Sequence, residues 1–150
     1  CRTTGEADRV LEVMAANGLK RGAEGLEVYV MTEIPSNVIE AEEFAKRFDG
    51  FSIGSNDLTQ LTLGIDRDSE ELAELFREDN PAVIWMIKTA VEKAHRSNAK
   101  IGLCGQAPRN DPALARGLVE FGIDSISVTP DSFLAVKRHV AEAERVLGIA

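Results

Sequence analysis

The sequence has little cysteine, fewer basic than acidic residues and no long apolar run, and each shortage excludes a class of protein. Its two cysteines, Cys1 and Cys104, offer no disulfide framework and fit a reducing cytoplasm. No uninterrupted apolar run approaches the roughly 20 residues of a membrane span. Lys and Arg number 17 against 25 Asp and Glu, and the net charge of −8 disfavours binding to nucleic acid phosphates. We therefore expect a cytoplasmic protein that binds neither nucleic acid nor membrane.

The chain also lacks a linker, a low-complexity tract or a block of like charge, so its 150 residues predict a single unit. Short apolar runs predict four strands, at residues 26–34, 50–54, 100–105 and 124–128. Apolar periodicity predicts helices at residues 4–16, 36–48, 69–78, 81–97, 111–122 and 131–147. The stretch after the second strand, which is rich in Asp and Thr, is expected to form a loop.

The strict alternation of helices and strands predicts an α/β fold in which helices flank a parallel sheet. Two architectures satisfy this order. One is a small open sheet of four strands. The other is half of a (β/α)₈ barrel, a fold that typically needs about 250 residues. Composition and spacing alone do not choose between them.

Polar side chains stand where the predicted strands end. Glu33 closes the first strand, Asn56 and Asp57 follow the second, and Cys104 closes the third. Because the loops at the carboxyl ends of parallel strands gather on one rim, we expect these side chains to converge. Two carboxylates on one rim repel unless a cation lies between them, and Mg²⁺ takes hard oxygen ligands of this kind. Glu33 and Asp57 are therefore the candidate metal ligands.

Each candidate also has a purely structural interpretation. Glu33 could cap the next helix and Asp57 could bond its own turn, and taken singly these are the commoner roles. Arg67 could hold a phosphate through its planar guanidinium or pair with an adjacent aspartate. The thiol of Cys104 could exchange a proton at a carbon next to a carbonyl, or serve as a small buried hydrophobe. Gln106 could donate to a substrate oxygen or complete the turn.

A resemblance to a known family is carried by three segments: "EIPSN" (33–37), "GSNDLTQLTLGIDR" (54–67) and "GLCGQAP" (102–108). Together they resemble the C-terminal barrel of the phosphoenolpyruvate-utilising enzymes. This family includes phosphoenolpyruvate synthase (pyruvate, water dikinase), pyruvate phosphate dikinase and enzyme I of the sugar phosphotransferase system. "CGQAP" is most similar to the synthase, because the other two usually carry Cys-Gly-Glu there. The resemblance covers essentially the whole chain and implies the second, C-terminal half of a (β/α)₈ TIM barrel.

The resemblance implies binding roles for the residues that match the family's motifs. Glu33 and Asp57 would hold Mg²⁺. Asn56 would bind the phosphate or carboxylate of the substrate, with the backbone at Ser55 assisting. Arg67 would grip the phosphate.

The resemblance also implies the chemistry. Cys104 would exchange a proton with the methyl or methylene carbon of pyruvate or phosphoenolpyruvate. The enolate of pyruvate would then take a phosphoryl group from a phosphohistidine, so that ATP, pyruvate and water become AMP, phosphoenolpyruvate and phosphate.

The sequence departs from the family by what it does not contain. It has no "TSHA"-type segment for the phosphohistidine, no ATP-binding domain and no first half of the barrel. We therefore expect these residues to be inactive alone and to work with the remaining domains of a larger enzyme, as a homodimer. Two alternatives stay open. One is the barrel of a pyruvate phosphate dikinase or an enzyme I, and the other is a non-catalytic module that binds a phosphorylated metabolite or mediates dimerisation.

Overall fold

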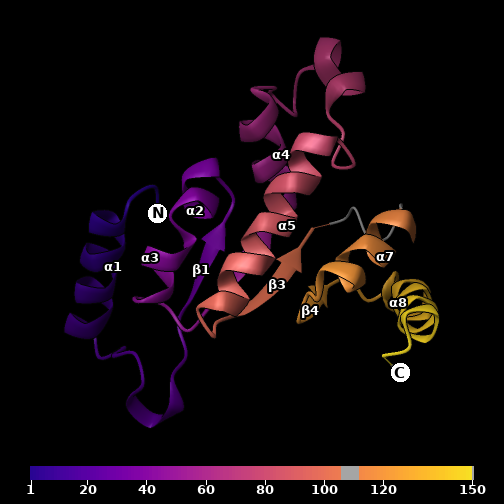
Figure 1. Ribbon diagram of the computed structural model, residues 1–150. Helices are drawn as coiled ribbons and strands as arrows, with labels where there is room; N and C mark the ends of the chain where they lie inside the picture. The colour runs from indigo at the N-terminus through magenta and orange to yellow at the C-terminus, as the bar shows by residue number, and fades with distance from the viewer. Residues whose placement is uncertain (106–111, 150) are drawn as a thin grey trace.

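The computed structural model describes residues 1–105 and 112–149, which form an α/β unit (Figure 1). Its strands are β1 (Tyr29–Thr32), β2 (Gly50–Gly54), β3 (Lys100–Cys104) and β4 (Ser125–Ser127). Its α-helices are α1 (Thr4–Ala16), α2 (Pro35–Ile39), α3 (Ala41–Ala45), α4 (Ser55–Leu63), α5 (Pro81–Arg96), α7 (Pro112–Phe121) and α8 (Phe133–Leu147). Two short 3₁₀ helices are η1 (Ala23–Gly25) and η2 (Glu70–Leu75).

The order of the strands decides between the two predicted architectures. The sheet runs β1-β2-β3-β4, and each strand pairs in parallel with the strand before it in the chain. The strand order therefore never reverses. In a doubly wound open sheet, by contrast, the order reverses at the switch point. Successive parallel neighbours are the arrangement of a (β/α)₈ barrel, of which four strands make half.

The two faces of the sheet differ in burial, and this difference also favours a half barrel. One face packs under the helices and is apolar, with Phe51, Ile53 and Ile101 at most 1% exposed. The opposite face carries Tyr29 and Met31, which are 41% and 37% exposed. A doubly wound sheet has helices on both faces, whereas the strands of a barrel turn one face inward. This sheet therefore has the faces of a half barrel.

The core lies between the sheet and the helices. Ile53 and Leu103 from the strands meet Ile87 and Val91 from α5, and none of the four is more than 1% exposed. Burying each such side chain contributes about 1.5–3 kcal/mol to folding. This packing fixes the sheet against α5, and so fixes the positions of the strand ends.

Helix α4 corrects the predicted loop after the second strand. Residues 55–63 are helical, and Gly64 ends the helix in the left-handed conformation at φ 65°. The Ser-Asn-Asp run was taken for a turn because these residues favour turns, but they are equally favoured at helix starts. The predicted helix at 69–78 is correspondingly reduced to the 3₁₀ helix η2.

The predicted helix at 36–48 is two helices, α2 and α3, which are separated at Glu40 with φ −100° and ψ 19°. In one continuous helix, Val38 and Phe44 would point about 120° apart. The break lets both side chains enter the core, where they are 1% and 0% exposed. Burial of these two residues thus overrides the simple periodicity.

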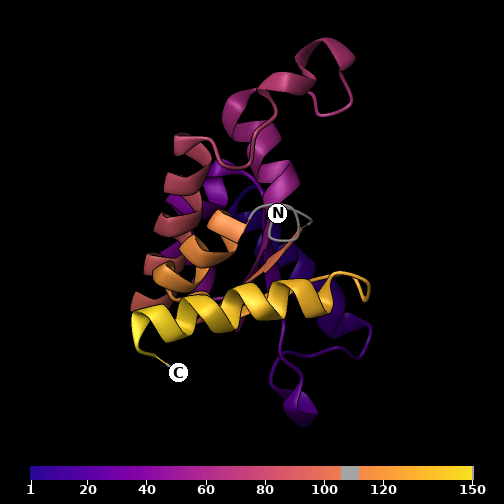
Figure 2. The ribbon, with the colours of Figure 1, turned by 90° about the vertical axis from the view of Figure 1, so that its right-hand side faces the viewer.

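Residues 64–80, here called the arm, extend past the carboxyl ends of the strands (Figures 1 and 2). The arm contains η2 and leads into α5, whose first turn is capped by the Asn80 side chain, with Oδ1 2.9 Å from the Ala82 nitrogen. Within residues 1–105 and 112–149, no helix is both long and apolar enough to span a bilayer.

Candidate active site

The junction between β2 and α4 forms one wall of the site. The strand ends at Gly54 and the helix begins at Ser55 with no residue between them. The N–H groups of the first helical turn have no partner inside the helix, and Asp57 in that turn is favourably placed in the helix dipole. Asn56 and Asp57 are only partly buried, so their side chains are available at the rim.

The sulfur of Cys104 lies between a donor and an acceptor on the neighbouring strand. Its Sγ is 3.4 Å from Ser52 Oγ, which donates to it, and 3.3 Å from the Ile53 carbonyl oxygen, to which the thiol donates. The sulfur therefore has one hydrogen-bond donor and one hydrogen-bond acceptor beside it on β2. Sequence analysis missed Ser52, although a serine on the inward face of an apolar strand was a readable signal.

Glu33 directly follows β1, and its carboxylate lies over Gly54. A methyl group built on Gly54 would lie 3.2 Å from Glu33 Cβ and 3.3 Å from Oε2. The absent side chain of this glycine is what leaves room for the carboxylate. Among the described residues, the Glu33 carboxylate makes no hydrogen bond or ion pair, and Asn37 Oδ1 accepts from the Glu33 backbone N–H at 3.3 Å. The Glu33 side chain therefore does not cap α2.

Arg67 returns from the arm to the same rim. Its Nη1 is 3.4 Å from Asp57 Oδ1, and each side chain is 46% exposed. Its backbone N–H donates to Gln60 Oε1 at 3.3 Å, which holds the start of the arm against α4. The partner of Arg67 is therefore the candidate metal ligand itself, and not the adjacent Asp66 or Asp68.

A cavity of about 370 Å³ opens at this rim. Its lining comes from all four strand ends and comprises Met31, Gly54, Asn56, Asp57, Cys104, Gly105, Ser127, Val128 and Thr129. This volume lies in the range of small-molecule sites. The structure therefore brings Asn56, Asp57 and Cys104 together, with Glu33 at the wall over Gly54.

The predicted substrate residue Ser55 stands apart from the cavity lining. The Ser55 side chain is fully buried behind the rim, so its backbone N–H is the group available for a ligand. Gln106 lies outside the described residues.

The carboxylates of Glu33 and Asp57 could supply only part of the ligand shell of a magnesium ion. Among the described residues, no group of three or more His, Cys, Asp and Glu side chains is placed to hold a metal. Mg²⁺ commonly takes only one or two protein carboxylates and completes its shell with water and substrate phosphate. The residues present therefore fit an ion whose remaining ligands come from substrate and solvent.

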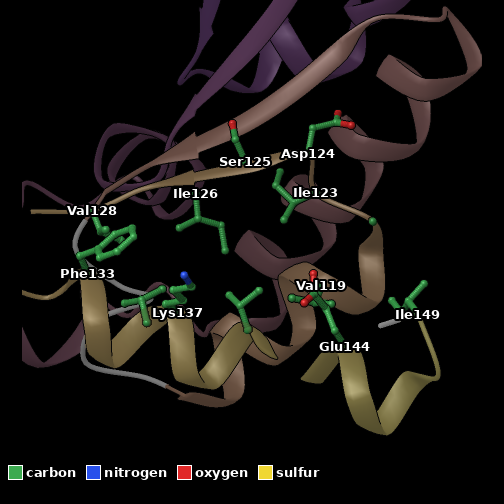
Figure 3. A pocket seen from close by; sticks show the side chains of 13 residues that line it. Val119, Ile123, Asp124, Ser125, Ile126, Val128, Phe133, Lys137, Glu144 and Ile149 are labelled. Carbon is green, nitrogen blue, oxygen red and sulfur yellow. The ribbon is translucent and has the colours of Figure 1, made fainter. Parts of the chain in front are cut away.

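A larger cavity of about 500 Å³ lies elsewhere, between β4, α7 and α8 (Figure 3). Apolar side chains such as Ile126, Phe133 and Val136 form much of its lining, and it contains none of the predicted site residues. Its size alone does not make it the active site, because the thiol, amide and carboxylate that the sequence predicted for the site line the smaller cavity.

The fold and the rim can now be compared with known proteins. A family model described as "PEP-utilising enzyme, PEP-binding domain" matches residues 3–145. The chain belongs to this family.

Relatives of this PEP-binding domain share much of its sequence. It is 58% identical over 148 residues to phosphoenolpyruvate synthase of Synechocystis sp., and 54% identical over 149 residues to that of Aquifex aeolicus. Each match covers 99% of this chain but only 18% and 17% of the relative. The chain thus spans less than a fifth of the length of these relatives.

Solved structures confirm the fold. An HpcH/Hpal aldolase/citrate lyase family protein from Burkholderia cenocepacia aligns with a TM-score of 0.57 at 22% identity, over 87% of this chain and 47% of its own. A citrate lyase from Burkholderia xenovorans aligns with a TM-score of 0.61 at 16% identity, over 91% of this chain and 44% of its own. The chain covers just under half of each barrel-like neighbour, as half a barrel should.

Proposed function

We propose that this chain is the second half of the phosphoenolpyruvate- and pyruvate-binding barrel of a phosphoenolpyruvate synthase. The whole enzyme would convert ATP, pyruvate and water to AMP, phosphoenolpyruvate and phosphate, with its phosphohistidine and ATP-binding domains elsewhere in a longer protein. The names of the relatives at 58% and 54% identity support this proposal. The single observation that carries it is the cavity that Asn56, Asp57 and Cys104 line together.

Cys104 would act on the methyl group of pyruvate. Its thiolate, stabilised by the Ser52 hydroxyl, takes a proton from the methyl carbon. The C–H bond breaks, an S–H bond forms, and the electron pair moves to the carbonyl oxygen as an enolate. The new S–H donates to the Ile53 carbonyl, and the enolate oxygen takes the phosphoryl group from the phosphohistidine.

The other rim residues would bind and orient the substrate. The Asn56 amide, the Ser55 N–H and the Gln106 amide are donors suited to a carboxylate or phosphate, and Arg67 would add a charged donor. Glu33 and Asp57 would hold Mg²⁺, which when bound supplies positive charge beside the enolate oxygen. Arg67 and the metal would share Asp57, so phosphate binding would draw Arg67 partly away from that carboxylate.

The two alternatives have less support. A dikinase or an enzyme I would carry Cys-Gly-Glu where this chain has Cys104-Gly105-Gln106. A non-catalytic module would not need a sulfur held between a proton donor and a proton acceptor. In the proposed enzyme the chain would act in the cytoplasm as part of a homodimer.

Calorimetry tests the proposal on the longest natural chain that contains these residues. We expect phosphoenolpyruvate to bind only with Mg²⁺ present, and Asp57→Ala or Glu33→Gln to weaken binding about tenfold or more. Glu43→Gln, on the exposed side of α3, is the matched control and should bind as the wild type does. Binding that ignores Mg²⁺ and both substitutions would reject the proposal. The 150 residues produced alone should form no phosphoenolpyruvate above background.

A further inference from the structure

Glu78 has no role in the proposed mechanism, yet its carboxyl is directed into the protein. It lies at the end of the arm, and its Oε1 is buried with no hydrogen-bond partner among the described residues. Burial raises the pKa of Glu78, and the nearby Ser55 hydroxyl offsets part of that rise. A buried oxygen without a partner costs about 1–3 kcal/mol, so its retention calls for a reason.

Capping of α5 does not explain why the buried carboxyl of Glu78 is retained. The helix begins three residues after Glu78, and its first turn is already capped by the Asn80 side chain. The Glu78 carboxyl lies instead near the hydroxyl of Ser55, at the start of α4.

Ser55 lies at the meeting point of three segments. Its side chain is 0% exposed, and its Oγ also has no hydrogen-bond partner among the described residues. The hydroxyl is close enough to act on the pKa of Glu78, although the geometry stops short of a hydrogen bond. On its other side is Gly105, where even a methyl group would overlap the Ser55 oxygen. The hydroxyl therefore stands between the arm and the backbone that follows Cys104.

We propose that Glu78 is a positioning residue for Cys104 and acts through Ser55 and Gly105. A small rotation that brings the Ser55 hydroxyl onto the carboxyl would satisfy both unpaired groups at once. That pair would hold the start of α4, the end of β3 and the arm together from the helix side of the sheet. This inference rests on the proposed function, because it assigns Glu78 to the placement of the proton-exchanging thiol.

The placement matters because both contacts of the sulfur are made with residues of β2. Sγ lies 3.4 Å from Ser52 Oγ and 3.3 Å from the Ile53 oxygen, so both hydrogen bonds would lengthen together if the end of β3 moved away from β2. Removing the Glu78 carboxyl frees the junction to move in that way. The expected result is a thiol with altered reactivity in a protein that still folds.

The test measures the rate at which iodoacetamide alkylates Cys104 in the longest natural chain. Peptide mass spectrometry follows the alkylation of this residue. Glu78→Leu removes the hydrogen-bonding group but keeps most of the bulk, whereas Glu78→Gln keeps a hydrogen-bonding amide. We expect Glu78→Leu and Ser55→Ala each to change the rate about threefold or more, and Glu78→Gln to stay within about twofold of the wild type. Glu74→Leu, on the exposed part of the same arm, is the matched control and should not change the rate.

The double variant tests whether the two residues act as one unit. Ser55→Ala should have little further effect in the Glu78→Leu background, because the pair is already broken. Equal rates for the wild type and both single variants would overturn the inference. So would a Glu78→Gln variant as impaired as Glu78→Leu, since that would assign the effect to charge and not to position.

Turnover separates this inference from the proposed function. In an active wild-type enzyme, we expect Glu78→Leu to lower kcat about tenfold with KM within about twofold, and Glu78→Gln to restore kcat. An inactive wild type whose Cys104 alkylation still depends on Glu78 would reject the proposed function and keep the positioning role. An active wild type whose kcat is unchanged by Glu78→Leu would reject the positioning role alone.

Discussion

Asp49 and Asp124 make the same pair of backbone contacts at the starts of two different strands. Asp49 donates its N–H to the Val28 oxygen at 2.9 Å and accepts from the Val28 N–H through Oδ2 at 2.8 Å. Asp124 repeats this with Ile101, at 3.0 Å and 2.8 Å. Each aspartate stands one residue before its own strand and ties that strand to the preceding one.

Removing either carboxylate should destabilise the fold. Asp49→Ala leaves the Val28 N–H, on a residue only 9% exposed, without its acceptor, and we expect a loss of about 1–3 kcal/mol in the free energy of unfolding. Urea denaturation measures the change. Asp8→Ala is a suitable control, because its exposed ion pair with Arg47 should contribute little. A loss no larger than that of the control would contradict the role given to Asp49.

The Asp49 contribution should also depend on pH. The hydrogen bond from the Arg21 guanidinium is the main cause that lowers the pKa of Asp49 below its ordinary value. Its stabilisation is therefore complete above the unfolded pKa of about 3.9 and is lost as the pH falls through the folded pKa. The difference in unfolding free energy between the wild type and Asp49→Asn should shrink as the pH is lowered from 7 toward about 3. A constant difference over this range would exclude the linkage.

Glu78 should show the opposite dependence. Burial raises its pKa, so the folded state holds the proton more tightly than the unfolded state does. Stability should then fall as the pH rises from the unfolded pKa of about 4.3 through the folded pKa. Glu78→Gln, which does not titrate, should remove this slope from a series of thermal melts. If the two proteins follow parallel profiles, Glu78 does not ionise with a shifted pKa.

The buried hydroxyl of Thr59 offers a stabilising change. Its side chain is 0% exposed, and Oγ1 has no hydrogen-bond partner among the described residues. Thr59→Val replaces the hydroxyl with a methyl group of similar size, and we expect a gain of about 1 kcal/mol with a higher Tm. Thr3→Val is the contrasting control, because Thr3 Oγ1 caps α1 by accepting from the Glu6 N–H at 3.2 Å and its loss should cost about 1 kcal/mol. A lower Tm for Thr59→Val would mean that the hydroxyl is paired in solution.

A substitution at Gly54 tests the placement of Glu33 without replacing a charged residue. A methyl group there would lie 3.0 Å from Met31 Cε and 3.3 Å from Glu33 Oε2, so Gly54→Ala should push the carboxylate from the rim. We expect Mg²⁺-dependent phosphoenolpyruvate binding to weaken about tenfold, as measured by calorimetry. Gly50→Ala crowds the Tyr29 ring at the other end of the same strand and is the matched control for binding. Unchanged affinity in Gly54→Ala would remove Glu33 from the site.

The strands at the rim were the most predictable part of the structure. Residues 50–54 were predicted as a strand and form β2, because an apolar run bounded by glycines has few other solutions. Helix α4 was missed because its first three residues favour turns and helix starts alike, and only burial of Leu58 and Thr59 against the core settles the choice.

Contacts between distant residues could not be predicted in the same way. The sequence indicated that Asn56, Asp57 and Cys104 share a rim, since parallel strands end at one edge. It gave no sign that Glu78 approaches Ser55, because that contact depends on how the arm folds back over α4.

The aspartate contacts and the cysteine pocket occupy opposite ends of the strands, separated by the five residues of β2, which span about 13 Å. The contacts expected to stabilise the fold and the proposed active site therefore lie in different places on one scaffold. Laboratory evolution toward a more stable protein could change residues around Asp49 and Asp124 and leave the proposed site intact.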